Sequence, residues 1–184
     1  MQNYSKLARI TLVLISVITL TTTAIIKNGN TQVRSYLKTQ IASISGRNPM
    51  PRFVSLRAEK VNMRPGPGIR YPVDWVYRRK NLPVEVIAEF GTWRKIHDAQ
   101  GGQGWIHQSM LSNRRMFVTV SQMRTIRSKD DSKSDSVAKL ERGVVGELKQ
   151  CPEASGWCKV FVGGYKGWLR RVEFWGVYPR EIIR

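Results

Sequence analysis

The sequence predicts an all-β protein in which two tandem small barrels follow an N-terminal signal or anchor helix. Three observations support this fold class. From residue 53 onward, short apolar or alternating runs are cut by Gly, Pro or Asn about every 8 to 12 residues, as in small barrels and sandwiches. Landmarks in the first half recur in the second half at equal spacing. The first thirty residues, in contrast, are basic and then apolar.

The N-terminal segment has the order of charge and hydropathy found in secretory signals. Lys6 and Arg9 precede an apolar stretch at 10–20 that continues more weakly to Ile26, and the first acidic residue of the chain is Glu59. The stretch is marginal for a transmembrane helix, which needs about 20 mostly apolar residues. We expect a periplasmic or exported protein, with residues 1–26 either cleaved as a signal peptide or kept as an anchor that attaches the chain to the inner membrane through residues 10–26.

Residues 27–52 are predicted to form a basic linker. The segment is polar, carries five basic and no acidic residues, and contains two Gly and two Pro that interrupt regular structure. Its apolar residues within 35–45 fall near helical spacing, which is compatible with one brief helix.

The remaining chain contains an internal repeat. In its first half, strands are predicted at 53–58, 75–77, 84–90, 93–98 and 104–107. The corresponding landmarks of the two copies are Arg64 and Arg127, Trp93 and Trp157, and Trp105 and Trp168. In both copies 41 residues separate the arginine from the last tryptophan. The repeat therefore predicts one barrel at 53–113 and a second, with a C-terminal extension, at 114–184.

Several motifs resemble the bacterial SH3 domains. These are VNMRPGPG at 61–68, GTWRKI at 91–96 and GWIH at 104–107. A second, more degenerate copy contains GGYKGWL at 163–169 and WGVYP at 175–179, and the pair resembles the two-domain SH3-like proteins of Gram-negative bacteria. The resemblance implies two SH3-like β-barrels, an envelope location and a ligand associated with the cell wall. It also implies no catalytic activity and no cofactor.

The loop and the Gly-Trp dipeptides have structural interpretations of their own. Residues 62–68 favour a reversing loop, because Gly accepts positive φ and Pro fixes φ near −65°, while Met63 enters the core. The corresponding segment 128–131 lacks Gly and Pro, so its loop must differ. The Gly-Trp dipeptides precede the last strand of each copy, where Trp105 and Trp168 either cover one end of the barrel or contact a ligand.

The two cysteines flank a tight turn between apolar runs. Cys151 and Cys158 can face each other across a hairpin, which in an exported protein predicts a disulfide. Closing so short a loop stabilises the fold by about 2 to 3 kcal/mol. No metal site is predicted, because the cysteine spacing is not C-x-x-C and His97 and His107 lack a third ligand and are interpreted as surface residues.

The charge of the chain indicates an anionic partner. Lys and Arg number 31 against 13 Asp and Glu, which gives a formal net charge of +18. Nucleic-acid binding by basic barrels is the alternative function on this ground. However, the basic clusters at 78–80, 114–115 and 170–171 are dispersed, and the export signal argues against nucleic acid. An enzyme is not expected, because no nucleophile with a base, no paired carboxylates and no metal set is visible.

A candidate ligand site lies near the loop of the first copy. Arg64, Pro65 and Gly66 of the loop, with Trp75 and Tyr77 on the next strand, would form a groove. Aromatic faces would meet sugar or peptide there, and the arginine would meet a carboxylate. Peptidoglycan is then the partner. The alternative partner is an envelope protein, to whose sheet the same loop or an unpaired barrel edge would add. The third alternative is that the two domains only support or space another part of the envelope.

Overall fold

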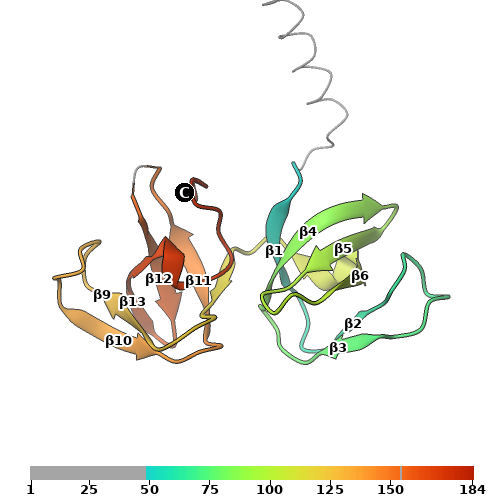
Figure 1. The fold of residues 1–184 in the computed structure, drawn as a ribbon, viewed down its shortest axis with the longest axis horizontal. Coiled ribbons are helices and arrows are strands. Elements are labelled where there is room, and N and C mark those ends of the chain that lie inside the picture. Colours follow the sequence, from blue (N-terminus) through green and yellow to red (C-terminus); the bar gives the residue numbers. More distant parts are fainter. Residues whose placement is uncertain (1–48, 154) are drawn as a thin grey trace, which may run out of the picture. The chain divides into compact units, whose positions relative to one another are not determined.

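The computed structural model describes residues 49–153 and 155–184 (Figure 1). The predicted signal or anchor at 1–26, the brief helix within 35–45 and most of the linker at 27–52 lie outside these residues. Within the described ranges, no helix has the length and apolar character needed to cross a bilayer. Residues 50–184 form one compact unit, which contains both of the hydrophobic cores found in the described chain.

The first copy of the repeat, here called barrel 1, is built from short antiparallel strands. They are β1 (Arg52–Leu56), β2 (Val61–Met63), β3 (Trp75–Tyr77), β4 (Pro83–Phe90), β5 (Trp93–His97), β6 (Gln103–His107) and β7 (Leu111–Ser112), with the 3₁₀ turn η1 (Gln108–Met110) before β7. Five strands form a sheet in the order β6-β5-β4-β1-β7, and β2 and β3 form a hairpin. All five strands predicted in this half are confirmed to within two residues at their ends.

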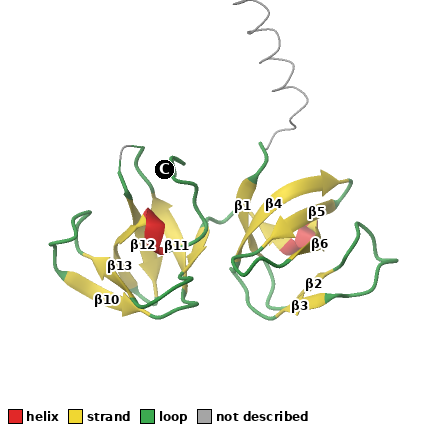
Figure 2. Cartoon of the chain, in the orientation of Figure 1, coloured by secondary structure: helices red, strands yellow, loops and turns green. Residues whose placement is uncertain are grey.

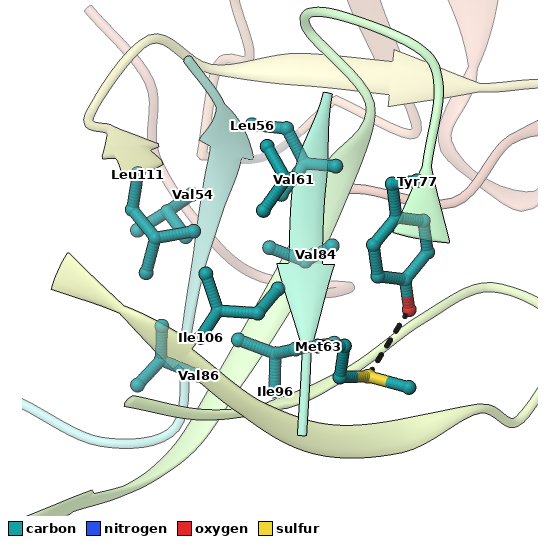
Figure 3. Packing of buried hydrophobic residues seen from close by; sticks show 10 residues of the cluster. All are labelled: Val54, Leu56, Val61, Met63, Tyr77, Val84, Val86, Ile96, Ile106 and Leu111. Atoms are coloured by element: carbon teal, nitrogen blue, oxygen red, sulfur yellow. Dashed lines mark hydrogen bonds between the residues drawn. The ribbon is translucent and has the colours of Figure 1, made fainter. Parts of the chain in front are cut away.

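The core of barrel 1 follows from the alternation of side chains along these strands (Figure 3). In β4, Val84 and Val86 point inward and are fully buried, and Ile96 and Ile106 do the same from β5 and β6. Met63 is buried as predicted. β2 was not predicted as a strand, because it has only three residues before the chain enters the loop.

The second copy, barrel 2, repeats this architecture (Figure 2). Its strands are β8 (Met116–Val118), β9 (Arg124–Arg127), β10 (Ser136–Leu140), β11 (Val145–Gln150), β12 (Trp157–Val162) and β13 (Tyr165–Arg170), followed by the 3₁₀ turn η2 (Arg171–Glu173). They form one sheet in the order β10-β9-β13-β12-β11-β8. The nearly all-β fold class is therefore confirmed in the described chain.

The strand registers show that the repeat seen in the sequence is also present in the structure. Met63 pairs with Trp75 across the β2–β3 hairpin, and Ile126 pairs with Ala138 across β9 and β10. Lys95 pairs with Trp105, and in barrel 2 Lys159 pairs with Trp168. Each residue of these two pairs of barrel 1 thus has a counterpart at the same place in barrel 2, and the two barrels serve as controls for one another.

The predicted disulfide is confirmed. Cys151 and Cys158 are bonded, and both are fully buried in the core of barrel 2. The bond joins the end of β11 to β12, so it closes the base of the loop between these strands. Barrel 1 has no cysteine at all, and its core is closed by aliphatic side chains alone at the corresponding strands.

The C-terminal tail, residues 174–184, packs on barrel 2 and also contacts barrel 1. Trp175 pairs with Val118, and Ile183 pairs with Cys151, through backbone hydrogen bonds. The Tyr178 hydroxyl donates to Glu85 of barrel 1 at 2.7 Å. Burial, together with this bond, raises the pKa of Tyr178, so the hydroxyl stays protonated and able to donate. The tail is an ordered part of the fold.

Candidate functional site

A groove of about 410 Å³ lies beside the first loop of barrel 1. Its walls come from β2, the loop 64–74, the start of β5, the end of β6 and η1. Groove 1 is defined by Lys60, Asn62, Arg64, Ile69, Trp93, His107 and Met110. Its lining combines apolar surface with cationic and amide groups and includes no carboxylate. The volume is in the range of sites that hold small ligands or single residues of a polymer.

Arg64 shapes groove 1 as well as lining it. Its Nη1 donates to the backbone carbonyl of Tyr71 and, at 3.5 Å, to that of Ile69. The guanidinium therefore ties the two sides of the loop together. Within the described chain Arg64 makes no ion pair, so its charge is not neutralised by a protein carboxylate.

Pro65 and Gly66, which were predicted to contact a ligand, form part of the loop beside groove 1. A Cβ placed on Gly66 would lie 2.4 Å from the Tyr71 ring, so the ring packs directly against the glycine backbone. Gly66 is buried, whereas Pro65 is exposed beside it. Neither residue belongs to the lining of groove 1. Glycine is required at position 66 because the Tyr71 ring lies too close to the backbone to leave room for a Cβ atom.

Trp93 and His107 form the opposite wall of groove 1. Their rings meet edge to face, with centroids 5.5 Å apart. His107 Nδ1 accepts from the backbone amide of Ser109 and lies 2.7 Å from its hydroxyl oxygen. In the neutral imidazole this leaves the proton on Nε2 as a further donor. His107 was interpreted from sequence as an ordinary surface residue, and the structure places it in the wall of this groove.

Barrel 2 has a groove at the equivalent place. Groove 2 has a volume of about 200 Å³ and is lined by Met123, Arg124, Thr125, Arg127, Ser132, Trp157, Arg170 and Glu173. Arg127 and Trp157 occupy the positions of Arg64 and Trp93. Arg127 Nη1 donates to the carbonyl of Ser134 at 2.8 Å, seven residues ahead, as Arg64 donates to that of Tyr71. Each groove therefore has an equivalent tryptophan in its wall and an equivalent arginine that supports the neighbouring loop.

The remaining lining residues differ between the grooves. Met110 of groove 1 corresponds to Glu173 of groove 2, whose carboxylate accepts from the backbone amide of Arg170 at 3.1 Å. Ile69 corresponds to Ser132. Groove 2 is thus smaller and more polar than groove 1, and it already contains a carboxylate.

Trp75 and Tyr77 do not join groove 1. Tyr77 is buried in the core, where its hydroxyl donates to Asp98 at 2.8 Å, so its ring offers no face to a ligand. Burial, and then the bond to Asp98, raise the pKa of Tyr77. Trp75 is 58% exposed at the mouth of the β2–β3 hairpin, outside the lining of the groove. The structure does not bring these two aromatics into groove 1 with Arg64, and for Tyr77 the reason is that alternation along β3 directs its side chain inward.

The Gly-Trp dipeptides close the barrels. Trp105 exchanges two backbone hydrogen bonds with Arg64, at 2.7 and 3.0 Å, and Trp168 pairs with Arg127. Gly104 and Gly167 permit this approach, because a Cβ on Gly104 would lie 2.5 Å from Met63 and one on Gly167 would lie 2.4 Å from the Arg127 carbonyl oxygen. Both tryptophans are half-buried and belong to neither groove.

Arg171 is a buried hydrogen-bond donor that was not identified from the sequence. Its guanidinium donates to four backbone carbonyls, those of Pro152, Ser155, Tyr178 and Glu181, at 2.7 to 3.2 Å. It therefore fastens the disulfide loop to the C-terminal tail. The pair Arg170-Arg171 looks like a surface cluster in the sequence, but only Arg170 is exposed. Within the described ranges, no group of three His, Cys, Asp or Glu side chains is placed to hold a metal ion.

The comparisons with known proteins give one family match, in two copies, and several similar solved structures. None of the curated proteins matches the chain. Similar solved structures include NlpC1 and NlpC2 from Trichomonas vaginalis, at 12% and 10% identity with a TM-score of 0.32 each. They align with 71% and 68% of this chain, which spans about half of theirs, 47% and 48%. The bacterial SH3 domain matches twice, at residues 57–113 and 120–176, once in each barrel, and the chain therefore belongs to the bacterial SH3 domain family.

Proposed function

We propose that this protein is a non-enzymatic binding module of the cell envelope that recognises peptidoglycan through groove 1. The observation that carries the proposal is the repeat of the groove. Two barrels that differ in loop sequence, size of groove and disulfide content keep the arginine and the tryptophan that build its walls. A surface retained in this way has a role beyond filling a core.

The chemistry of groove 1 suits a fragment of cell-wall peptide or glycan. The Trp93 ring offers an apolar face to a sugar ring or an aliphatic side chain. Lys60, Arg64 and the Asn62 amide offer donors to carboxylates, which the stem peptides of peptidoglycan carry. The net charge of +18 would raise the local concentration of the protein on an anionic wall.

The compartment and the absence of catalysis are parts of the same proposal. A disulfide and bacterial SH3 domains fit an extracytoplasmic protein. The apolar stretch at 10–20 supports export, with residues 10–26 serving as a signal or an inner-membrane anchor. Both cysteines of the chain are bonded to each other, so no thiol remains to act as a nucleophile.

An envelope protein is the second candidate partner. Among the strands of residues 49–153 and 155–184, β3 pairs with β2 alone and β10 pairs with β9 alone, so each barrel ends a sheet on a strand with one edge unpaired within this part of the chain. A partner strand could add there through backbone hydrogen bonds. This mode would not depend on the side chains of groove 1.

The test is retention of residues 49–184, which include both cores and the disulfide, on insoluble peptidoglycan at about 0.15 M and about 0.5 M salt. The double variant Lys60→Met, Met110→Glu installs the residues of groove 2 in groove 1. It should fold, because barrel 2 carries these residues at the same positions. We expect the wild type to be retained at both salt concentrations and the variant to lose at least about tenfold in affinity.

A matched control carries the same change of charge away from both grooves. Lys139→Met with Gln150→Glu alters two exposed positions of barrel 2 and should be retained like the wild type. Equal loss in the two variants, or binding that disappears at the higher salt, would mean that net charge alone acts. In that case nucleic acid or an envelope protein becomes the better candidate partner.

A further inference from the structure

The first loop of barrel 1 exposes large apolar side chains that the fold does not need. Ile69 is 85% exposed, Val73 43% and Trp75 58%. All three lie on or at the end of the connection between β2 and β3 (Figure 1). Exposed Trp and aliphatic residues gathered on one segment usually mark an interaction surface.

Barrel 2 shows that these side chains are dispensable for folding. The β2–β3 and β9–β10 registers align Trp75 with Ala138, and the same alignment places Ile69 opposite Ser132 and Val73 opposite Ser136. Every exposed apolar residue of the first loop is thus a small or polar residue in the second. A barrel of the same architecture forms without them, so their presence in barrel 1 calls for a functional reason.

The loop holds these side chains in a fixed place. Arg64 bonds to the carbonyls of Ile69 and Tyr71, and the Tyr71 ring packs on Gly66. Backbone bonds from Gly68 to Gly66, from Tyr71 to Gly68 and from Asp74 to Met63 close the loop further. Ile69 and Trp75 are therefore presented to solvent by an ordered segment.

The charge around the loop selects the kind of partner. Between residues 60 and 80 barrel 1 has six basic residues and one acidic residue, a net charge of +5. The corresponding segment of barrel 2, 123–143, has six basic and four acidic residues, a net charge of +2. Arg70 is exposed on the loop beside Ile69, and Arg78, Arg79 and Lys80 are exposed where the chain leaves β3; none of the four forms an ion pair within the described chain.

We propose that this loop docks barrel 1 on the surface of a phospholipid bilayer that contains anionic headgroups. Ile69, Val73 and Trp75 enter the interfacial region, where Trp is favoured, and the arginines and Lys80 meet the headgroup phosphates. The chain that precedes the described residues carries the apolar stretch 10–20, which the sequence predicts to be targeted to a membrane. Barrel 1 is the barrel next to that stretch along the chain. The loop would orient it toward the bilayer and leave barrel 2 free.

The experiment measures partition of residues 49–184 into vesicles, which removes any contribution from the apolar stretch. Vesicles with about one-third phosphatidylglycerol are compared with pure phosphatidylcholine at about 0.1 M salt. The wild type should sediment with the anionic vesicles. The triple variant Ile69→Ser, Val73→Ser, Trp75→Ala, which copies barrel 2, should lose about tenfold or more in partition coefficient.

A control variant removes exposed apolar side chains elsewhere. Val172→Ser with Tyr165→Ala changes two exposed residues of barrel 2, and it should bind vesicles like the wild type. Quenching of tryptophan fluorescence by brominated lipid should be present in the wild type and reduced in Trp75→Phe. Absence of wild-type binding, equal binding to neutral vesicles, or a triple variant that binds like the wild type would each overturn the proposal. Retention on peptidoglycan is a separate measurement, so either function can fail alone.

Discussion

The loop that follows β2 in barrel 1 and the loop that follows β9 in barrel 2 begin with the same arginine and then diverge. Arg64 and Arg127 each reach a carbonyl seven residues ahead. Beyond them, barrel 1 has Pro, Gly and exposed apolar residues, whereas barrel 2 has Ser, Lys and Asp. The two loops differ in composition, but each is supported by the same kind of hydrogen bond, from the arginine to a backbone carbonyl. Each loop also borders a groove.

This comparison sorts the features of the chain into those that both barrels keep and those that one barrel has alone. The features that both barrels keep are the arginine, the tryptophan at the start of β5 and β12, and the glycine that lets the last long strand approach β2 or β9. The features found in one barrel are the apolar loop and wide groove of barrel 1, and the disulfide and tail of barrel 2. We expect the shared set to control stability most strongly.

The shared glycine gives the largest predicted effect. In Gly167→Ala the new Cβ would lie 2.4 Å from the backbone oxygen of Arg127, whereas in Gly104→Ala the nearest atom, at 2.5 Å, belongs to the Met63 side chain and the equivalent backbone oxygen, that of Arg64, is farther away at 2.9 Å. We expect Gly167→Ala to lower the free energy of unfolding of barrel 2 by about 3 to 4 kcal/mol, and Gly104→Ala that of barrel 1 by about 1 to 2 kcal/mol.

Denaturant unfolding combined with amide exchange, which reports on each barrel separately, measures both values. An equal loss in the two barrels would show that Met63 cannot move aside, and that the two closures are equally rigid. A negligible loss in either barrel would contradict the role given to the shared glycine.

The disulfide tests a feature that barrel 1 lacks. Replacing Cys151 and Cys158 together by Ala should destabilise barrel 2 by about 2 to 3 kcal/mol and leave barrel 1 nearly unchanged, because the loop constraint is lost only in barrel 2. Exchange protection should fall in the strands that the bond joins, β11 and β12, and in the tail residues bonded to Cys151. A similar loss of protection in barrel 1 would mean that the barrels unfold as one unit.

The smallest predicted effect concerns the tail and pH. Burial raises the pKa of Glu181, but hydrogen bonds from Arg115 and the Tyr178 amide, and the charges of Arg115 and Arg171, outweigh burial and hold this pKa below the ordinary value of 4.5. A detached tail would bind a proton more readily than a docked one. Docking is therefore strongest above about pH 4.5 and weakens as the pH falls through the lowered pKa.

Amide protection factors for residues 176–184, corrected for intrinsic exchange, should fall between about pH 6 and about pH 3. The variant Glu181→Gln keeps a hydrogen-bond acceptor but no charge, and its protection should depend much less on pH. Equal pH dependence in the two proteins would assign the effect to other carboxylates.

The strands of barrel 1 could be predicted from sequence because their residues alternate and their turns contain Gly, Pro or Asn. The predicted pairing of the cysteines rested on similarly local information. The same alternation could have excluded Tyr77 from the ligand site, since Tyr77 and its partner Val61 share one face and both are buried. Proximity to the loop along the chain was given more weight than side-chain direction.

Groove 1 could not be predicted because its walls are distant in sequence. Lys60 and His107 come together only after β2 and β6 are joined through the Arg64–Trp105 pair. The repeat did contain one usable signal, since Trp93 and Trp157 are retained without being fully buried. Arg171 gave no such signal, because its acceptors are backbone carbonyls, which have no sequence pattern.

The four carbonyls around Arg171 bear on how this chain can be divided. The family match in barrel 2 ends at residue 176, yet two of these acceptors, on Tyr178 and Glu181, lie beyond it. A fragment that ends at that boundary would leave the buried Arg171 guanidinium without two of its four carbonyl acceptors. The match in barrel 1 begins at residue 57, after β1, which lies between β4 and β7 in the sheet. Each barrel of this protein, with β1 in the first and the tail in the second, is therefore longer than the segment by which its family is recognised.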